Sequence, residues 1–195
     1  MTPIRERKCI YHLTALDNLN SIIDNGLLSR KSLEQCNMSF ADVADREIIE
    51  KRKSLNIVDC VPFHFHTYTD FDVYVQHQHS EEFIFLAIYK NKAREKGFLI
   101  IPKHPLSCES HEIFDYDMGI EQINWDIMEL TREQDGYDSR VRMAECLSNH
   151  CDLDISDINI IFVPNVKIEQ TVHDILACHN ITNVDVKRKE ILFVR

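Results

Sequence analysis

One glutamate stands out among the residues that can take part in bond-breaking chemistry. Glu145 lies in the segment 142–147, between Ala144 and Cys146, so its carboxylate has apolar neighbours on both sides. If the segment is helical, Glu145 lies at the edge of the inner face. If it is extended, Glu145 alternates with Ala144 and Cys146. Such a carboxylate can stabilise a cation or accept a proton, or it can pair with a neighbouring arginine at the surface.

Histidines and cysteines raise the question of metal binding and thiol chemistry. The candidate metal ligands are two His-x-His pairs and one looser group: His64 with His66, His77 with His79, and His104 with Cys108 and His111. Zinc sites usually use Cys-x-x-Cys or helical His-x-x-x-His spacing, which these groups lack. The sequence therefore predicts no metal site. Cys60 and Cys146 lack protease-like surroundings and are expected to be inert thiols.

Composition limits the class of protein. A chain of 195 residues with 44% hydrophobic and 28% charged residues fits a single globular domain over residues 1–195. The net charge of −10 argues against a protein that coats nucleic acid. Seven cysteines, an odd number without a Cys-x-x-Cys pair, indicate reduced thiols. No signal peptide or membrane-length apolar run is visible, so we expect a cytoplasmic location and no membrane partner.

Elements that position these residues follow from hydrophobic periodicity. Thr14 is expected to cap a helix that ends at Asn25 and Gly26. The pattern predicts further helices over residues 43–54, 120–130, 139–149 and 168–179, and strands over residues 61–68, 82–89, 97–101, 159–163, 184–186 and 191–194. The nearly continuous apolar strands 82–89 and 97–101 indicate central positions covered on both faces. Only four glycines occur, so no glycine-rich phosphate loop can form. The fold class is α+β.

Eight short segments, in order over roughly residues 9 to 165, resemble the DarT family, bacterial toxins that transfer ADP-ribose from NAD to bases in single-stranded DNA. They are Tyr11-His12-Leu13-Thr14, Asp17-Asn18-Leu19, Gly26-Leu27-Leu28-Ser29, Glu50-Lys51-Arg52, Val61-Pro62-Phe63-His64-Phe65, Lys103-His104, Asn124-Trp125 and Arg142-Met143-Ala144-Glu145-Cys146-Leu147. The resemblance implies an ADP-ribosyltransferase fold, with a split, mostly antiparallel β-sheet, flanking helices and the nicotinamide held between the halves of the sheet.

The resemblance also implies roles for particular residues. Glu145 is the implied catalytic carboxylate. Tyr11, His12 and Thr14 are implied to bind NAD, with the His12 ring at the adenosine-proximal ribose or the nicotinamide. NAD is consumed as a co-substrate, and no metal is required because nicotinamide leaves through a nitrogen that is already cationic.

One departure from the family pattern concerns an arginine. The best-known branch has a Pro-Arg-Ser-Pro segment after the strand, and its arginine assists catalysis. Here no arginine occurs between Arg52 and Arg94. The candidates for that role are Arg46, Arg52, Arg140, Arg142 and, in part, His66. The departure marks a divergent branch and favours guanine over thymine as the modified base.

Substrate and partner expectations complete the resemblance. His104, Tyr68 and Phe71 are candidates for contact with single-stranded DNA, the aromatic rings by stacking on an unpaired base. A DarG-like macrodomain antitoxin that removes ADP-ribose from DNA is the implied partner, in a toxin–antitoxin or phage-defence setting. Two alternatives stay open: transfer to RNA or protein, and an inactive module that binds NAD or DNA.

Overall fold

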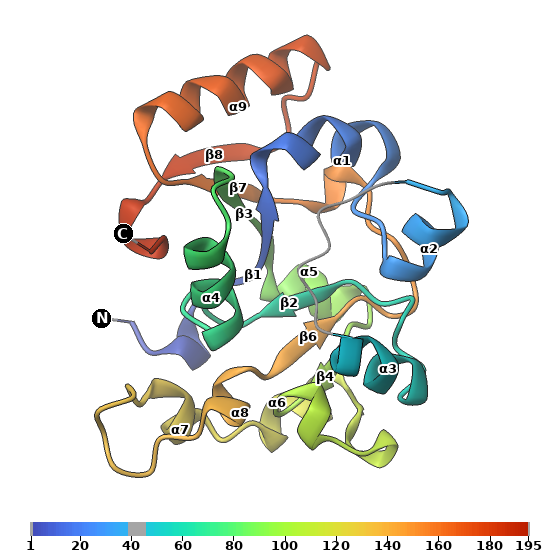
Figure 1. Ribbon diagram of the computed structural model, residues 1–195, viewed down its shortest axis with the longest axis vertical. Coiled ribbons are helices and arrows are strands. Elements are labelled where there is room, and N and C mark those ends of the chain that lie inside the picture. Colours follow the sequence, from blue (N-terminus) through green and yellow to red (C-terminus); the bar gives the residue numbers. More distant parts are fainter. Residues whose placement is uncertain (1, 39–45, 195) are drawn as a thin grey trace.

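The computed structural model describes residues 2–38 and 46–194. Within these residues the strands form one eight-stranded sheet in the order β5-β4-β6-β2-β1-β3-β7-β8 (Figure 1). Their bounds are β1 Cys9–Ala15, β2 Pro62–His64, β3 Phe83–Tyr89, β4 Leu99–Ile101, β5 Phe114–Asp115, β6 Glu145–Leu147, β7 Ile160–Val163 and β8 Asp185–Arg188. Every neighbouring pair is antiparallel except β7 and β8.

Helices surround the sheet. They are α1 Leu19–Asn25, α2 Arg30–Gln35, α3 Arg46–Ser54, α4 Asp70–Gln78, α5 Lys90–Glu95, α6 Tyr116–Gln122, α7 Trp125–Glu129, α8 Ser139–Arg142 and α9 Val166–Cys178. In Figure 1, α9 lies beside β8 at one end of the molecule, while α6, α7 and α8 gather at the other. None of the helices in the described part is long and apolar enough to cross a bilayer.

The sheet is narrow in its middle. β1 pairs with β3 along its whole length, but it meets β2 at one residue pair, Tyr11 and His64. Two halves therefore join at this point, β5-β4-β6-β2 on one side and β1-β3-β7-β8 on the other. The prediction of a split, mostly antiparallel α+β fold is confirmed.

The apolar sequence of β3 matches its position in the centre of the sheet. Ile84, Leu86 and Ile88 belong to the main hydrophobic cluster, while Phe85 and Ala87 belong to a second cluster on the opposite face. Because side chains alternate along a strand, both faces of β3 are buried. The predicted central position of this strand is confirmed.

The segment around Glu145 is extended, not helical. The predicted helix over 139–149 is wrong beyond Arg142, because α8 ends there and β6 begins at Glu145. β6 fills the space between β2 and β4 and pairs with both. Ala144 and Cys146 then face the main cluster, while Leu147 packs in a third cluster.

Thr14 does not cap a helix. It lies in β1 opposite Ile84, and a 3-10 turn that begins at Leu16 leads into α1. The Thr14 hydroxyl instead accepts a hydrogen bond from the Asn18 side chain at 3.2 Å. The predicted stop is confirmed, since Gly26 follows α1 with φ of 88°.

Other boundaries differ from the sequence-based expectation. The strand expected over 61–68 is only β2, the helix expected over 120–130 is divided into α6 and α7, and 191–194 holds a 3-10 turn in place of a strand. Residues 43–45 of the helix expected over 43–54 lie outside the described residues. The strand β1 and the helices α2, α4 and α5 were not anticipated.

Gly119 of α6 packs so closely on β4 that no side chain fits. An added Cβ would lie 2.3 Å from the Cβ of Ile100, which is fully buried and pairs with Cys146 of β6. We expect Gly119→Ala to lower the free energy of unfolding by about 1–3 kcal/mol, as overpacking does. Urea denaturation measures this. The neighbouring exposed Met118→Ala should leave the midpoint almost unchanged; an unchanged midpoint for Gly119→Ala would contradict the packing.

Candidate active site

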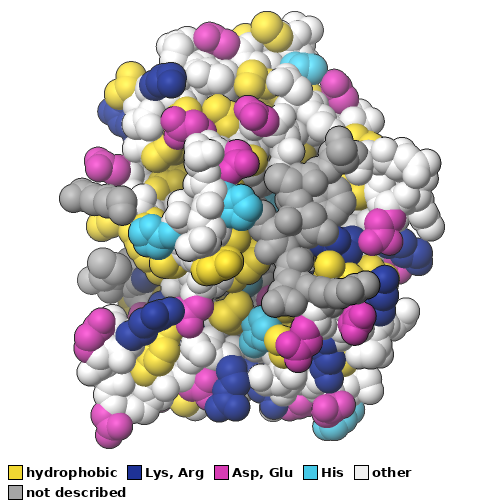
Figure 2. Space-filling view, in the orientation of Figure 1, with side chains coloured by type: hydrophobic (Ala, Val, Ile, Leu, Met, Phe, Trp, Pro, Cys, Tyr) yellow, Lys and Arg dark blue, Asp and Glu magenta, His cyan; other side chains and the backbone are white. Residues whose placement is uncertain are grey.

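A cavity of about 460 Å³ lies where the two halves of the sheet meet. β1, β2 and β6 contribute to its floor, and side chains of α1 to α4 form much of its wall. Its polar lining includes His12, Thr14, Asn18, Arg52, His64, His104 and Glu145. Figure 2 shows hydrophobic and histidine side chains close together near the middle of this face, with acidic and basic side chains scattered around them. The volume is within the range of small-molecule sites.

Glu145 is the buried acid of this cavity. Its side chain is 4% exposed, and the terminal nitrogen Nη2 of Arg52 lies 2.6 Å from both carboxylate oxygens. Leu55 and Ile57, just beyond α3, pack in the same cluster as Leu147 of β6, and this packing seats the end of α3 beside Glu145. A buried charge is costly unless it is paired. Arg52 therefore compensates the charge of Glu145.

His12 enters the cavity from β1 as a neutral imidazole. Its Nδ1 lies 2.8 Å from the carbonyl oxygen of Pro62, so Nδ1–H donates this hydrogen bond and Nε2 carries no proton. Burial lowers the pKa of His12, which favours this neutral form. Thr14, two residues along the same strand, also lines the cavity and is buried.

His64 behaves differently because an acid contacts it. Its Nδ1 lies 3.3 Å from Oδ2 of Asp72, and the Thr69 hydroxyl donates a hydrogen bond of 2.6 Å to the same oxygen. Burial opposes protonation of His64, but the Asp72 carboxylate outweighs this effect and raises the pKa. His64 also pairs with Glu145 across β2 and β6. A cation can thus lie next to the buried acid.

Two predicted substrate-contacting residues line the cavity. His104 accepts a hydrogen bond from the Leu106 amide through Nδ1 at 3.3 Å, and burial lowers the pKa of its ring. Phe71, on the first turn of α4, has its ring centre 6.4 Å from that of His64.

Tyr11 lies on the other face of the sheet. Its ring packs 6.3 Å from Phe85 and 5.9 Å from Phe162, and burial raises the pKa of its phenol to about 12. It does not line the cavity. The prediction that Tyr11 binds NAD therefore does not fit the structure.

Two of the other arginine candidates, Arg140 and Arg142, are held by partners other than Glu145. Arg140 pairs with Asp138 at 2.7 Å and its side chain is 64% exposed. Arg142 donates hydrogen bonds to the carbonyl oxygens of Met128 and, at 2.8 Å, Leu130. Arg46 begins α3, and its side chain lies outside the described part of the structure.

His66 and Tyr68 also lie away from the cavity lining. The buried His66 ring contacts the Arg142 carbonyl oxygen at 3.0 Å through Nε2 and accepts from the Tyr68 amide at 3.2 Å. The Tyr68 hydroxyl donates to the carbonyl oxygen of Phe193 at 3.1 Å. Both residues therefore fix the chain after β2.

Sequence reasoning missed His64 and Asp72 as site residues. The sequence did contain a signal for the helix that carries Asp72, because Thr69-x-x-Asp72 is a capping-box pattern that marks a helix start. The structure shows Thr69 capping α4, with the Asp72 amide 3.0 Å from its hydroxyl. The place of His64 beside Glu145 depends on strand register, which the sequence does not reveal.

Comparisons with known proteins identify the family of this chain. The family model described as "ssDNA thymidine ADP-ribosyltransferase, DarT" matches residues 11–193. The chain belongs to the DarT family. Its resemblance to this family is therefore confirmed over nearly the full length of the chain.

Solved structures and a curated relative share this similarity. DarT of Thermus sp. 2.9 in complex with ADP-ribosylated ssDNA matches with a TM-score of 0.78 and 19% identity over 97% of both chains. DarTG of Thermosipho africanus with ADP-ribose gives 0.73 and 22%, over 96% of this chain and 51% of the other. A DNA ADP-ribosyl transferase–glycohydrolase fusion protein of Thermosipho africanus is 25% identical over 88% of this chain and 46% of its own length. The chain thus spans about half of that relative.

The pair of His64 and Asp72 predicts a pH effect. In Asp72→Asn the carboxylate is lost, so the pKa of His64 should fall, as measured by NMR titration of the imidazole. The raised folded-state pKa contributes stability below about pH 6.5, and this contribution is lost as the pH rises through that pKa. The stability deficit of the variant should therefore shrink above about pH 6.5.

The matched control is Glu81→Gln, which removes an exposed carboxylate 3.6 Å from His79. It should leave the titration of His64 unchanged. If Asp72→Asn also leaves that titration unchanged, the carboxylate does not act on His64 as described.

Proposed function

We propose that this protein transfers ADP-ribose from NAD to a base in single-stranded DNA. The observation that carries the proposal is the buried Glu145 in the cavity wall, charge-compensated by Arg52 at the junction of the two half-sheets. Membership of the DarT family supports it. So does the likeness to Thermus DarT in complex with NAD+, at a TM-score of 0.75.

The proposed chemistry breaks one glycosidic bond and forms another. The bond between ribose C1′ and the nicotinamide nitrogen breaks, and its electron pair neutralises the cationic ring. Positive charge develops on C1′ and the ring oxygen, where the Glu145 carboxylate stabilises it. A base nitrogen then attacks C1′ and gives its proton to Glu145.

Arg52 supplies the positive charge that an arginine after the strand supplies in the best-known branch of the family. Since one nitrogen holds both carboxylate oxygens, Arg52 fixes the orientation of Glu145 from α3. His12 and Thr14 are proposed to hold the ribose and nicotinamide portion. The neutral His12 suits this place, because a further cation beside the sugar would oppose the positive charge that develops on it.

The acceptor side of the cavity carries aromatic groups. Phe71 and the exposed Tyr74 both come from α4 and line the cavity, so either ring is available to stack on a base, with His104 nearby. An unpaired base costs little to present, which favours single strands.

The base itself is part of the proposal. Guanine was expected because the strand arginine is missing. Arg52 weakens that reason, since an arginine does contact Glu145, and the matching family is described for thymidine. Thymine and guanine are therefore the two bases that the experiment must separate.

A partner that removes ADP-ribose from DNA also belongs to the proposal. The Thermosipho relative is named as a fusion of a transferase with a glycohydrolase. We take residues 1–195 as the transferase domain, with a macrodomain antitoxin as its counterpart. The cytoplasmic location stays a prediction.

Glu145→Gln is the direct test of the activity. We expect transfer to fall by about 10²–10⁴-fold, because the neutral amide can neither stabilise the sugar cation nor take a proton. Mass spectrometry of short oligonucleotides that hold one thymine or one guanine, incubated with NAD, measures the acceptor, the added mass and the base.

The control is Glu121→Gln, which removes an exposed carboxylate on α6. If ADP-ribose appears only on added protein or RNA, DNA is not the acceptor. If wild type and Glu145→Gln cleave NAD equally, the protein is an inactive binding module and not an enzyme.

Arg52→Lys tests the orienting role. Lysine keeps the charge but carries it on a compact ammonium at the end of a flexible stem, so the contacts that Nη2 of Arg52 makes with both carboxylate oxygens should be loosened. We expect kcat to fall by about 10–100-fold, which corresponds to one hydrogen bond to a charged group. Arg140→Lys, which alters an exposed ion pair, should retain full activity. A wild-type kcat in Arg52→Lys would show that the orientation of Glu145 does not depend on Arg52.

A further inference from the structure

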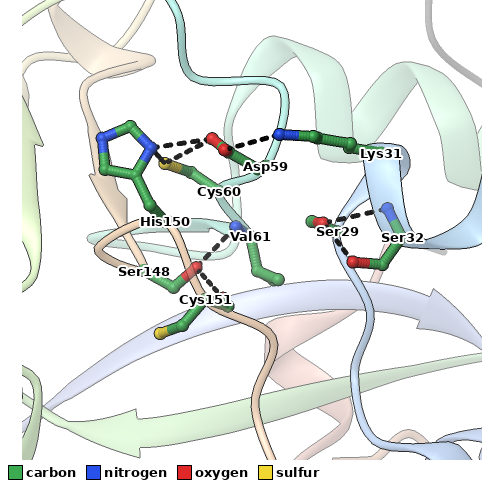
Figure 3. Close-up of polar contacts among 9 residues, drawn as sticks. All are labelled: Ser29, Lys31, Ser32, Asp59, Cys60, Val61, Ser148, His150 and Cys151. Atoms are coloured by element: carbon green, nitrogen blue, oxygen red, sulfur yellow. Dashed lines mark hydrogen bonds and ion pairs between the residues drawn. The ribbon is translucent and has the colours of Figure 1, made fainter.

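A second group of reactive side chains lies between the main cavity, which Cys60 lines, and a smaller polar hollow of about 210 Å³, which Asp59 and His150 line. Asp59 and Cys60 come just before β2, and His150 follows β6. Figure 3 shows the carboxylate, the thiol and the imidazole turned toward one another. Among the described residues, these are the histidine, cysteine and acidic side chains that bring three ligand atoms within 4.8 Å of one another.

The geometry is not that of a nucleophilic cysteine. His150 Nδ1 lies 2.7 Å from Oδ1 of Asp59 and 3.8 Å from Sγ of Cys60. A catalytic triad uses the two ring nitrogens separately, one for the nucleophile and one for the acid. Here Asp59 and Cys60 both lie near the same nitrogen, Nδ1 of His150, so the ring cannot pass a proton from the thiol to the acid through its two nitrogens.

We propose that Asp59, Cys60 and His150 bind a Zn²⁺ ion, with water at the fourth position. Carboxylate oxygen, thiolate sulfur and imidazole nitrogen are the three donor types of zinc sites. Zinc–ligand bonds of about 2.0–2.3 Å in a tetrahedron place neighbouring donors about 3.3–3.6 Å apart. The three donors lie 2.7, 3.8 and 4.0 Å apart, so small side-chain rotations suffice.

Charge and surroundings suit the ion. A carboxylate, a thiolate and a neutral imidazole balance Zn²⁺, and binding releases the Cys60 thiol proton to solvent. Lys31 contacts the other carboxylate oxygen, Oδ2, at 3.3 Å. Oδ1 can therefore bind the ion while Oδ2 keeps its outer partner.

The backbone around the cluster is already fixed. The Ser148 hydroxyl accepts a hydrogen bond from the Val61 amide at 2.8 Å and donates one to the Cys151 carbonyl oxygen at 2.6 Å. These bonds join the segments that carry Cys60 and His150. The same segments continue into β2 and β6, the strands of His64 and Glu145, so the ion would fasten the ends of the two strands that form the active site.

Titration of the untagged full chain with Co²⁺ tests the site. Thiolate bound to tetrahedral Co²⁺ gives a charge-transfer band in the near ultraviolet and visible d–d bands. We expect both at one equivalent, and Zn²⁺ should displace them. Zn²⁺ at 100 times its Kd should also raise Tm by about 5–10 °C, the shift that linkage predicts for a chain of this size.

Two variants and a matched control decide the outcome. Cys60→Ser should abolish the charge-transfer band. His150→Ala, at a side chain 40% exposed, should abolish the d–d bands without disturbing the core. Cys151→Ser should keep the full spectrum, because this neighbouring thiol points away from the cluster in Figure 3. A spectrum like that of free Co²⁺, or bands that survive in Cys60→Ser, would overturn the proposal, as would bands lost only in Cys151→Ser.

Discussion

Glu145 places a carboxylate inside the protein with only 4% of its side chain exposed, and the arrangement around it follows from that constraint. A buried carboxylate without a partner would cost several kcal/mol. Arg52 provides the partner from α3, which is seated by the cluster of Leu55, Ile57 and Leu147. Helix packing, strand position and charge compensation therefore depend on one another.

The narrow junction of the sheet creates the room for this site. Where β1 and β2 separate beyond Tyr11 and His64, backbone groups must find other partners than a continuous ladder. The Pro62 carbonyl takes His12 as its partner. No buried side-chain nitrogen or oxygen among the described residues lacks a hydrogen bond. The site thus places several polar groups at an opening in the sheet without leaving any of them unsatisfied.

Sequence reasoning reached the parts of the fold that periodicity encodes. The apolar run of β3 and the amphipathic α9 were predicted because burial on two faces or on one stripe leaves a visible pattern. The segment 139–149 was misjudged because β6 has three residues, too few to show a period of two. Its extended form depends on partners β2 and β4, which are distant in sequence.

The candidate site shows the same difference between residues that local sequence indicates and residues that only long-range packing brings together. Glu145 and His12 were found because short family segments carry them, and Arg52 was one candidate of five. Only the packing of α3 distinguishes Arg52 from Arg140 and Arg142. The cluster joins the adjacent Asp59 and Cys60 to His150, which lies about ninety residues further along the chain, so no local motif could have revealed it.

The net charge of −10 limits how a polyanion can be held. Neutralising many phosphates would require a basic surface, whereas Figure 2 shows acidic and basic side chains interspersed on the face of the cavity. Arg52, which lies in the cavity lining, is already paired with Glu145. A DNA strand would therefore be held mainly by the base that enters the cavity, through stacking on rings such as Phe71, and only secondarily through its backbone. Under the proposed function an accessible base is favoured, because a base inside a duplex would first have to be unstacked.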